Sequence, residues 1–163
     1  MRLTISYILL FAAQVVVLNH LDFSMYLKPQ LFILILISLP PYLNRSLQMI
    51  IAFGLGLMLD LFVSTPGLHA SACMLLILLR MFLVNRMDVE EILANHDPIR
   101  YSNLGSARFL FLSGILVLVY HLYVFGIESI GAVNIVNYFL TVLISSVATY
   151  TLILLIQYLY SSN

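Results

Sequence analysis

Apolar residues fill six long stretches of the chain, and short polar or proline-containing segments separate them. Such runs approach the roughly 20 apolar residues that a membrane-spanning helix needs. The stretches cover residues 3–18, 29–43, 47–63, 66–84, 108–125 and 133–158. Several are short, so tilt or local thinning of the bilayer must make up the difference. We therefore expect an all-α, polytopic integral membrane protein with six transmembrane helices.

Composition supports a membrane location. Of 163 residues, 63% are hydrophobic and 9% are charged, whereas soluble domains carry about 25% charged residues. The mean hydropathy is +1.08. The net charge is zero, which argues against nucleic acid as a partner. We expect one transmembrane domain over residues 1–163. The single Cys73 excludes an internal disulfide, and we expect it to pack as a small hydrophobe.

The basic residues set the expected orientation. If the chain starts in the cytoplasm, one basic residue, Lys28, faces outward. The six on the cytoplasmic side are Arg2, Arg45, Arg80, Arg86, Arg100 and Arg108. This bias predicts a cytoplasmic N-terminus and C-terminus. The same orientation makes residues 85–107 a cytoplasmic loop. Glu90 and Glu91 in this loop belong either to a solvated connector or to a docking site for a partner.

An acidic residue, Asp60, interrupts the third apolar stretch. A carboxylate facing lipid would cost on the order of 2 to 3 kcal/mol, so it should face the protein interior. Thr65 and Pro66 are typical of an N-cap and a first helical turn. We therefore expect Asp60 to bond to the start of the fourth helix, with His69 at a similar depth.

Gly54 and Gly56 precede this acid and would allow a neighbouring helix to approach closely. The residues around Asp60, in the expected hairpin of the third and fourth helices, leave three alternatives open for their role. They could anchor the structure, bind a partner, or carry ion or proton chemistry, because an intramembrane acid near a histidine suits a proton relay.

Catalytic and metal-binding patterns are missing from the sequence. The four histidines have no metal-site spacing, and there is no glycine-rich phosphate loop, G-x-S-x-G or H-E-x-x-H motif. Ser145, Ser146 and Thr149 suit hydrogen bonds between helices better than nucleophilic chemistry. We expect no enzyme activity, no catalytic residue, no metal and no cofactor.

Five features of the sequence form one pattern: Asn19-His20, Leu39-Pro40, the run FGLGLMLDLF over residues 53–62, the run TPGLHA over residues 65–70 (with Pro66, Gly67 and His69), and Arg80. In these features the chain resembles the MreD family of bacterial membrane proteins. The family pattern includes the G-L-x-x-D core and the P-G-x-x-A turn. One departure is Met81, where relatives often have proline. From about Met87 onward only the hydropathy matches.

This resemblance implies a non-enzymatic scaffold in the bacterial cell-elongation machinery. Its partners would be an MreC-like protein, with MreB, RodA and a class B transpeptidase, in the bacterial inner membrane. The family's fold is similar to the substrate-binding subunits of energy-coupling factor transporters. A small-molecule (vitamin-type) uptake subunit is therefore the alternative function, and a general membrane assembly factor is a third.

Overall fold

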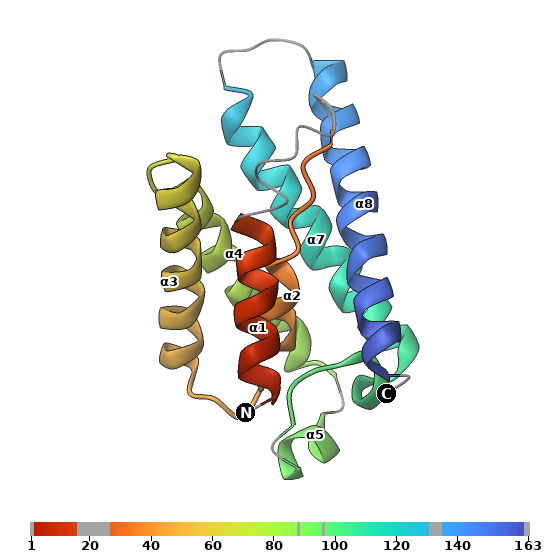
Figure 1. The fold of residues 1–163 in the computed structure, drawn as a ribbon. Helices are drawn as coiled ribbons and strands as arrows, with labels where there is room; N and C mark the ends of the chain where they lie inside the picture. Colours follow the sequence, from red (N-terminus) through yellow and green to blue (C-terminus); the bar gives the residue numbers. More distant parts are fainter. Residues whose placement is uncertain (1, 16–26, 88, 96, 131–134, 162–163) are drawn as a thin grey trace.

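A computed structural model describes residues 2–15, 27–87, 89–95, 97–130 and 135–161 (Figure 1). These residues contain helices and no strand. The helices are α1 (Arg2–Ala13), α2 (Ile33–Ser38), α3 (Arg45–Val63), α4 (Leu68–Val84), α5 (Glu90–Ala94), α6 (Tyr101–Leu104), α7 (Ser106–Glu128) and α8 (Ile135–Ser161).

Three of the described helices are long and apolar enough to cross a membrane: α3, α7 and α8. The fourth apolar helix, α4, has 17 residues and falls just below that length. The protein is therefore all-helical and has the character of a helical membrane protein. The six expected spans are not confirmed, because α1 has 12 residues and α2 only 6.

The expectation of a continuous helix over residues 29–43 is wrong. Pro40 explains where α2 ends. Leu39, which precedes Pro40, takes the extended backbone (φ −52°, ψ 135°) that a residue before proline favours. At 1.5 Å per residue, α2 rises only about 9 Å. Every side chain of α2 is buried, so it is a central element of the core.

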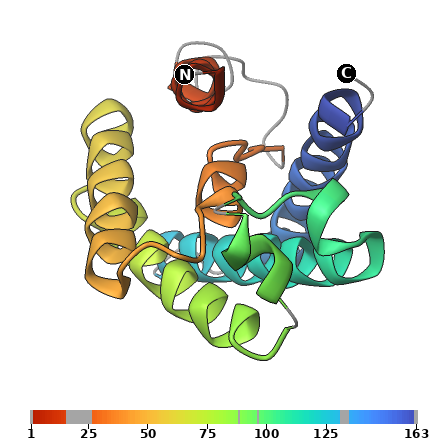
Figure 2. The same cartoon turned by 90° about the horizontal axis from the view of Figure 1, so that it is seen from below.

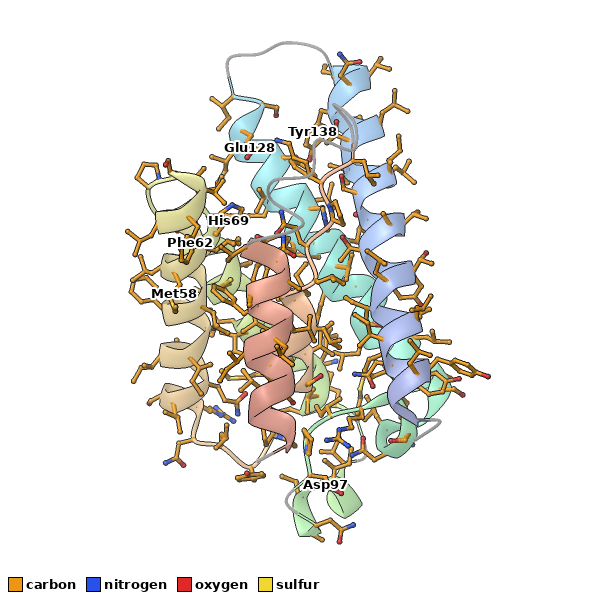
Figure 3. All side chains as sticks on the ribbon, in the orientation of Figure 1. Met58, Phe62, His69, Asp97, Glu128 and Tyr138 are labelled. Atoms are coloured by element: carbon orange, nitrogen blue, oxygen red, sulfur yellow. The ribbon has the colours of Figure 1, made fainter. Side chains whose placement is uncertain are left out.

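The helices surround α2 (Figure 2). α3 packs on α4, α4 on α7, and α7 on α8, while α2 contacts both α4 and α7. Seen from below, α1 stands on the remaining side, apart from α3 and α8. Side chains cover the outer faces of α3 and α8 (Figure 3), and the exposed ones there are mainly large and apolar. This is the arrangement that a lipid solvent favours.

α1 begins and α8 ends at one end of the bundle, where α5 also lies (Figure 1). The loop around α5 and α6 is not purely solvated, because Ile92, Ile99 and Leu104 are buried. The turn between α3 and α4 lies at the opposite end. This arrangement puts both ends of the described chain on the same side of the bundle.

Three tyrosines pack between helices. The hydroxyl groups of Tyr7, Tyr138 and Tyr150 donate to the backbone carbonyls of Ser38, Leu122 and Leu110, respectively. Each bond joins two different helices.

Candidate functional site

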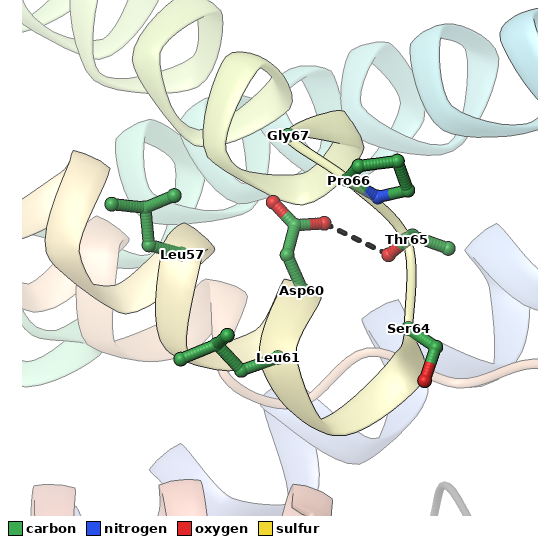
Figure 4. A pocket seen from close by; sticks show the side chains of 7 residues that line it. All are labelled: Leu57, Asp60, Leu61, Ser64, Thr65, Pro66 and Gly67. Atoms are coloured by element: carbon green, nitrogen blue, oxygen red, sulfur yellow. Dashed lines mark hydrogen bonds between the residues drawn. The ribbon is translucent and has the colours of Figure 1, made fainter.

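The carboxylate of Asp60 joins the end of α3 to the start of α4 (Figure 4). Its Oδ1 accepts hydrogen bonds from Thr65 Oγ1 and from the backbone N–H of His69, both at 2.8 Å. Its Oδ2 accepts from the backbone N–H of Ala70 at 2.9 Å. Asp60 is only 6% exposed. The expected bond between Asp60 and the start of the fourth helix is confirmed, and the negative charge also lies at the positive end of the α4 dipole.

The turn itself differs from the prediction. The N-cap of α4 is Gly67 (φ +78°), not Thr65, and Pro66 lies in the turn before the helix. Gly67 suits this position because it adopts a positive φ without strain. The capping acceptor comes from Asp60, which leaves the Thr65 hydroxyl to donate to that carboxylate. A distant side chain thus replaces the local cap.

The two glycines of α3 have different surroundings. A Cβ atom at Gly56 would lie 2.5 Å from the Cα of Ala70 and 2.7 Å from the carbonyl oxygen of His69. Gly56 is therefore where α3 and α4 touch, as predicted. Among the described residues, a Cβ at Gly54 would meet nothing within 4 Å. The prediction of close helix approach at Gly54 is therefore wrong for the described part of the chain.

The ring of His69 turns away from Asp60 and toward α7. His69 Nδ1 lies 2.6 Å from the hydroxyl oxygen of Tyr120, and both side chains are buried. The two rings are nearly parallel, with centroids 6.2 Å apart. His69 therefore bonds to Asp60 through its backbone and to α7 through its side chain, so the hairpin is fixed to the bundle.

Beyond the hairpin, a second set of buried polar groups holds the extended chain before α2. The N–H of Lys28 donates to Ser145 Oγ at 3.0 Å, and the N–H of Gln30 donates to Thr149 Oγ1 at 2.9 Å. Because backbone N–H groups away from water need partners, these two hydroxyls of α8 satisfy groups that a helix would have satisfied itself.

Gln14 completes this set from the α1 side. Its Oε1 accepts from the N–H of Leu31 at 2.6 Å, and its Nε2 donates to the carbonyl of Pro29 at 3.2 Å. Gln14 and Gln30 were not among the residues predicted to be functional. The sequence does mark both of them, because each is an amide side chain inside an apolar stretch, and Gln30 directly follows a proline.

His121 extends the same cluster. Its Nδ1 lies 2.8 Å from the carbonyl of Val117, which can only accept, so Nδ1 carries the proton. In the neutral ring Nε2 then accepts from the Thr149 hydroxyl, at 3.4 Å. Thr149 bonds to another helix as predicted, whereas the bond of Ser145 goes to the extended chain at Lys28. Ser146 does not bond as predicted, because its buried Oγ has no hydrogen-bond partner among the described residues.

Arg80 is only 1% exposed and is not a surface charge of the predicted cytoplasmic side. Its Nε donates to the carbonyl of Ile37 at 3.0 Å, and Nη2 donates to the carbonyl of Leu39. Nη1 donates to Gln48 Oε1 at 2.9 Å. The guanidinium therefore lies at the C-terminal end of α2, where free carbonyls and the helix dipole favour a cation.

The structure does not describe the side chains of four other candidate residues. Asn19 and His20 lie outside the described residues. The backbone of Glu90 and Glu91 begins α5, and their side chains also lie outside what the structure describes. The docking role suggested for this loop therefore stays a prediction.

A shallow hollow of about 490 Å³ lies beside the hairpin, lined by Leu57, Asp60, Leu61, Ser64, Thr65, Pro66 and Gly67 (Figure 4). The carboxylate of Asp60, which lines this hollow, already accepts three hydrogen bonds. In the part of the chain that the structure describes, no three His, Cys, Asp or Glu residues are grouped to hold a metal ion.

Comparisons with known proteins add no relative. No family model matches the chain, and neither a curated protein nor a solved structure matches it.

Proposed function

We propose that the chain is a non-enzymatic scaffold of the bacterial cell-elongation machinery. It would lie in the cytoplasmic membrane with both termini inside the cell. It would bind an MreC-like membrane protein and help to organise MreB, RodA and a class B transpeptidase during lateral peptidoglycan synthesis. The basis is the resemblance of residues 53–70 and Arg80 to the MreD family.

The observation that carries this proposal is the way the resembling residues meet. Gly56 touches the start of α4, and Asp60 bonds to the first N–H groups of α4. The shared pattern is thus a single structural device that fixes one helix hairpin. A rigid hairpin with an apolar outer face is what a scaffold needs in order to dock the transmembrane helices of partners.

Arg80 supports the same reading. It is distant from the hairpin turn, at the other end of α4, and it bonds to backbone carbonyls at the end of α2. Both charged residues of the pattern are therefore occupied with the backbone of this chain. Such residues stabilise a shape and supply no free group for a reaction.

The uptake-subunit alternative has less support. A vitamin site needs several convergent polar groups in a pocket. Lys28, the basic residue expected on the outer side, forms an ion pair with Glu128 at 3.4 Å. The hollow beside the hairpin offers mainly apolar lining and an acid that already accepts three hydrogen bonds.

The test is affinity purification of the tagged, full-length chain in a mild detergent, followed by mass spectrometry. We expect an MreC-like protein together with cell-wall synthases. The control is a tagged membrane protein of similar size from the same cells. Recovery of ATPase subunits and a bound small molecule would contradict the scaffold and support the uptake subunit.

The loop prediction has its own test. We expect the double substitution Glu90→Gln and Glu91→Gln to reduce recovery of cytoplasmic partners such as MreB, while the MreC-like protein is still recovered. Unchanged recovery of every partner would remove the docking role from this loop without affecting the scaffold proposal.

A further inference from the structure

The segment from Lys28 to Leu39, which contains α2, joins opposite ends of the bundle. At its start, Lys28 Nζ lies 3.4 Å from Glu128 Oε2, and Glu128 is the last residue of α7. At its end, the carbonyl of Leu39 accepts a hydrogen bond from Arg80, near the end of α4. α4 runs toward the end of the bundle where α5 lies, and α7 runs away from it (Figure 1). The segment therefore extends from one end of the bundle to the other.

The backbone just before α2 has the alternation of an extended chain. The N–H groups of Lys28 and Gln30 donate to hydroxyls of α8, at 3.0 and 2.9 Å. The other two residues bond instead to Gln14, directly after α1. The carbonyl of Pro29 accepts from the Gln14 amide at 3.2 Å, and the N–H of Leu31 donates to its oxygen at 2.6 Å. Successive residues of an extended chain direct their polar groups to opposite sides, so this stretch has one edge toward Gln14 and the other on α8.

The two hydroxyls of α8 give the direction of this stretch. Ser145 and Thr149, which accept the bonds, are four residues apart in a helix and so about 6 Å apart along its axis. Lys28 and Gln30 are two residues apart, which is about 6.6 Å in an extended chain. The two spacings match, and the residue numbers increase in the same direction in both elements. The stretch therefore runs alongside α8, one of the helices long enough to cross a membrane.

α2 continues the segment toward the α5 end of the bundle. Its first turn is closed by a hydrogen bond of 3.0 Å from the N–H of Leu34 to the carbonyl of Leu31, and all of its side chains are buried. An extended residue rises about 3.3 Å and a helical residue about 1.5 Å, so residues 28–39 cover about 22 Å, whereas a continuous helix would cover about 17 Å. The interruption thus lets the segment reach farther, and the long side chain of Lys28 carries its charge beyond the backbone.

Backbone that is not helical is tolerated inside a membrane where the protein itself satisfies its polar groups. The extended stretch meets this condition, because Gln14 serves one edge and the hydroxyls of α8 serve the other. At the far end of α2, Arg80 serves the carbonyls of Ile37 and Leu39. A stretch in contact with water could bond to water instead, so these buried partners indicate a crossing through the interior.

We propose that residues 28–39 cross the membrane as an interrupted span, extended in the half next to Glu128 and helical in the half next to Arg80. The extended half is a strap that fastens the end of α1 to α8, with Gln14 on one edge and Thr149 on the other. The crossing and the strap do not depend on the partners named for the scaffold, so either inference can fail without the other.

The first experiment locates the two ends of the segment by cysteine labelling. Lys28→Cys and Asn44→Cys each place a thiol at an exposed site, one at the start of the segment and one after its end. A membrane-impermeant maleimide is added to right-side-out and to inverted membrane vesicles. We expect Lys28→Cys to react in right-side-out vesicles and Asn44→Cys in inverted vesicles. The wild-type chain is the control, because its Cys73 is 0% exposed and should stay unlabelled.

The labelling pattern separates the crossing from the orientation. Reaction of the two thiols in opposite kinds of vesicle supports the crossing, whichever thiol faces outward. Reaction of both thiols in the same kind of vesicle would show that the segment enters and leaves on one side, and would overturn the crossing. Reaction of neither thiol in folded protein, followed by full reaction after unfolding, would overturn it as well.

The second experiment tests the strap by amide hydrogen exchange. Thr149→Val removes one of its fastenings, and Thr151→Val is the matched control, because that hydroxyl bonds within α8. If the strap is one unit, Thr149→Val should speed exchange at Gln30 and also, by about threefold or more, at Leu31, whose own partner is Gln14. Wild-type exchange at Leu31 in Thr149→Val, or an equal increase in Thr151→Val, would overturn the strap.

Discussion

Replacement of Asp60 tests the central feature of the hairpin. Asp60→Ala removes the acceptor of three hydrogen bonds and leaves the N–H groups of His69 and Ala70 without partners. Each unsatisfied buried N–H costs about 1 to 3 kcal/mol, and a lost helix cap alone costs about 0.5 to 2 kcal/mol. Since these effects overlap, we expect a loss of about 3 to 5 kcal/mol in the free energy of unfolding.

Asp60→Asn should be milder. The amide oxygen can still accept from His69 and Thr65, but the amide nitrogen then faces the N–H of Ala70 as a second donor. The loss of one bond predicts a cost of about 1 to 3 kcal/mol. Proteins of this size have a total stability of about 5 to 15 kcal/mol, so the alanine variant should also accumulate less in the membrane.

The assay is unfolding of the full chain in mixed micelles by titration with sodium dodecyl sulfate, followed by circular dichroism. The matched control is Leu61→Ala, because Leu61 is the next residue and is 82% exposed. We expect the order wild type, Leu61→Ala, Asp60→Asn, Asp60→Ala from most to least stable. If Asp60→Ala unfolds at the wild-type midpoint and all variants reach equal membrane levels, the anchoring role is refuted.

Four further substitutions test other contacts, those at Gly56, Gly54 and Arg80 by the same titration and that at Thr149 by amide hydrogen exchange. Gly56→Ala should cost about 1 to 3 kcal/mol, because its Cβ would press on the Ala70 backbone, whereas Gly54→Ala enters open space and should be neutral or stabilising. Thr149→Val should speed amide hydrogen exchange at Gln30 about tenfold or more, and wild-type exchange would contradict the bond. Arg80→Lys should destabilise, because one ammonium cannot match the three directed donors; an unchanged midpoint would contradict this.

The hairpin was predictable because its information is local. Asp60 lies nine residues before His69 and ten before Ala70, and an acid inside an apolar stretch must find donors nearby. The free N–H groups of a following helix are the nearest supply. Which residue is the N-cap of α4 was not predictable, because Thr65 and Gly67 are both common at helix starts. The position of the N-cap depends on which N–H groups the Asp60 carboxylate contacts.

The break before α2 was harder to foresee, since hydropathy does not distinguish a buried helix from buried extended chain. The groups that make the extended chain stable come from Ser145 and Thr149, which lie 117 and 119 residues away in the sequence. Arg80 shows the same limit in another form. A basic residue near the end of an apolar stretch suggests a charge exposed in a loop. Arg80 is instead buried, because it donates hydrogen bonds to carbonyls at the end of α2, about 40 residues away in the sequence.

Five buried polar residues of this chain share one physical role, and that role bears on function. Asp60 bonds to N–H groups at the start of α4, and Arg80 bonds to carbonyls at the end of α2. Ser145, Thr149 and Gln14 bond to N–H groups of the extended segment. Each serves a place where a helix begins, ends or is interrupted, which is where a low-dielectric environment leaves backbone groups without partners. A proton relay or ion site would instead need polar groups that remain available to a moving charge. The pattern of these contacts therefore favours a fixed structural framework over ion chemistry.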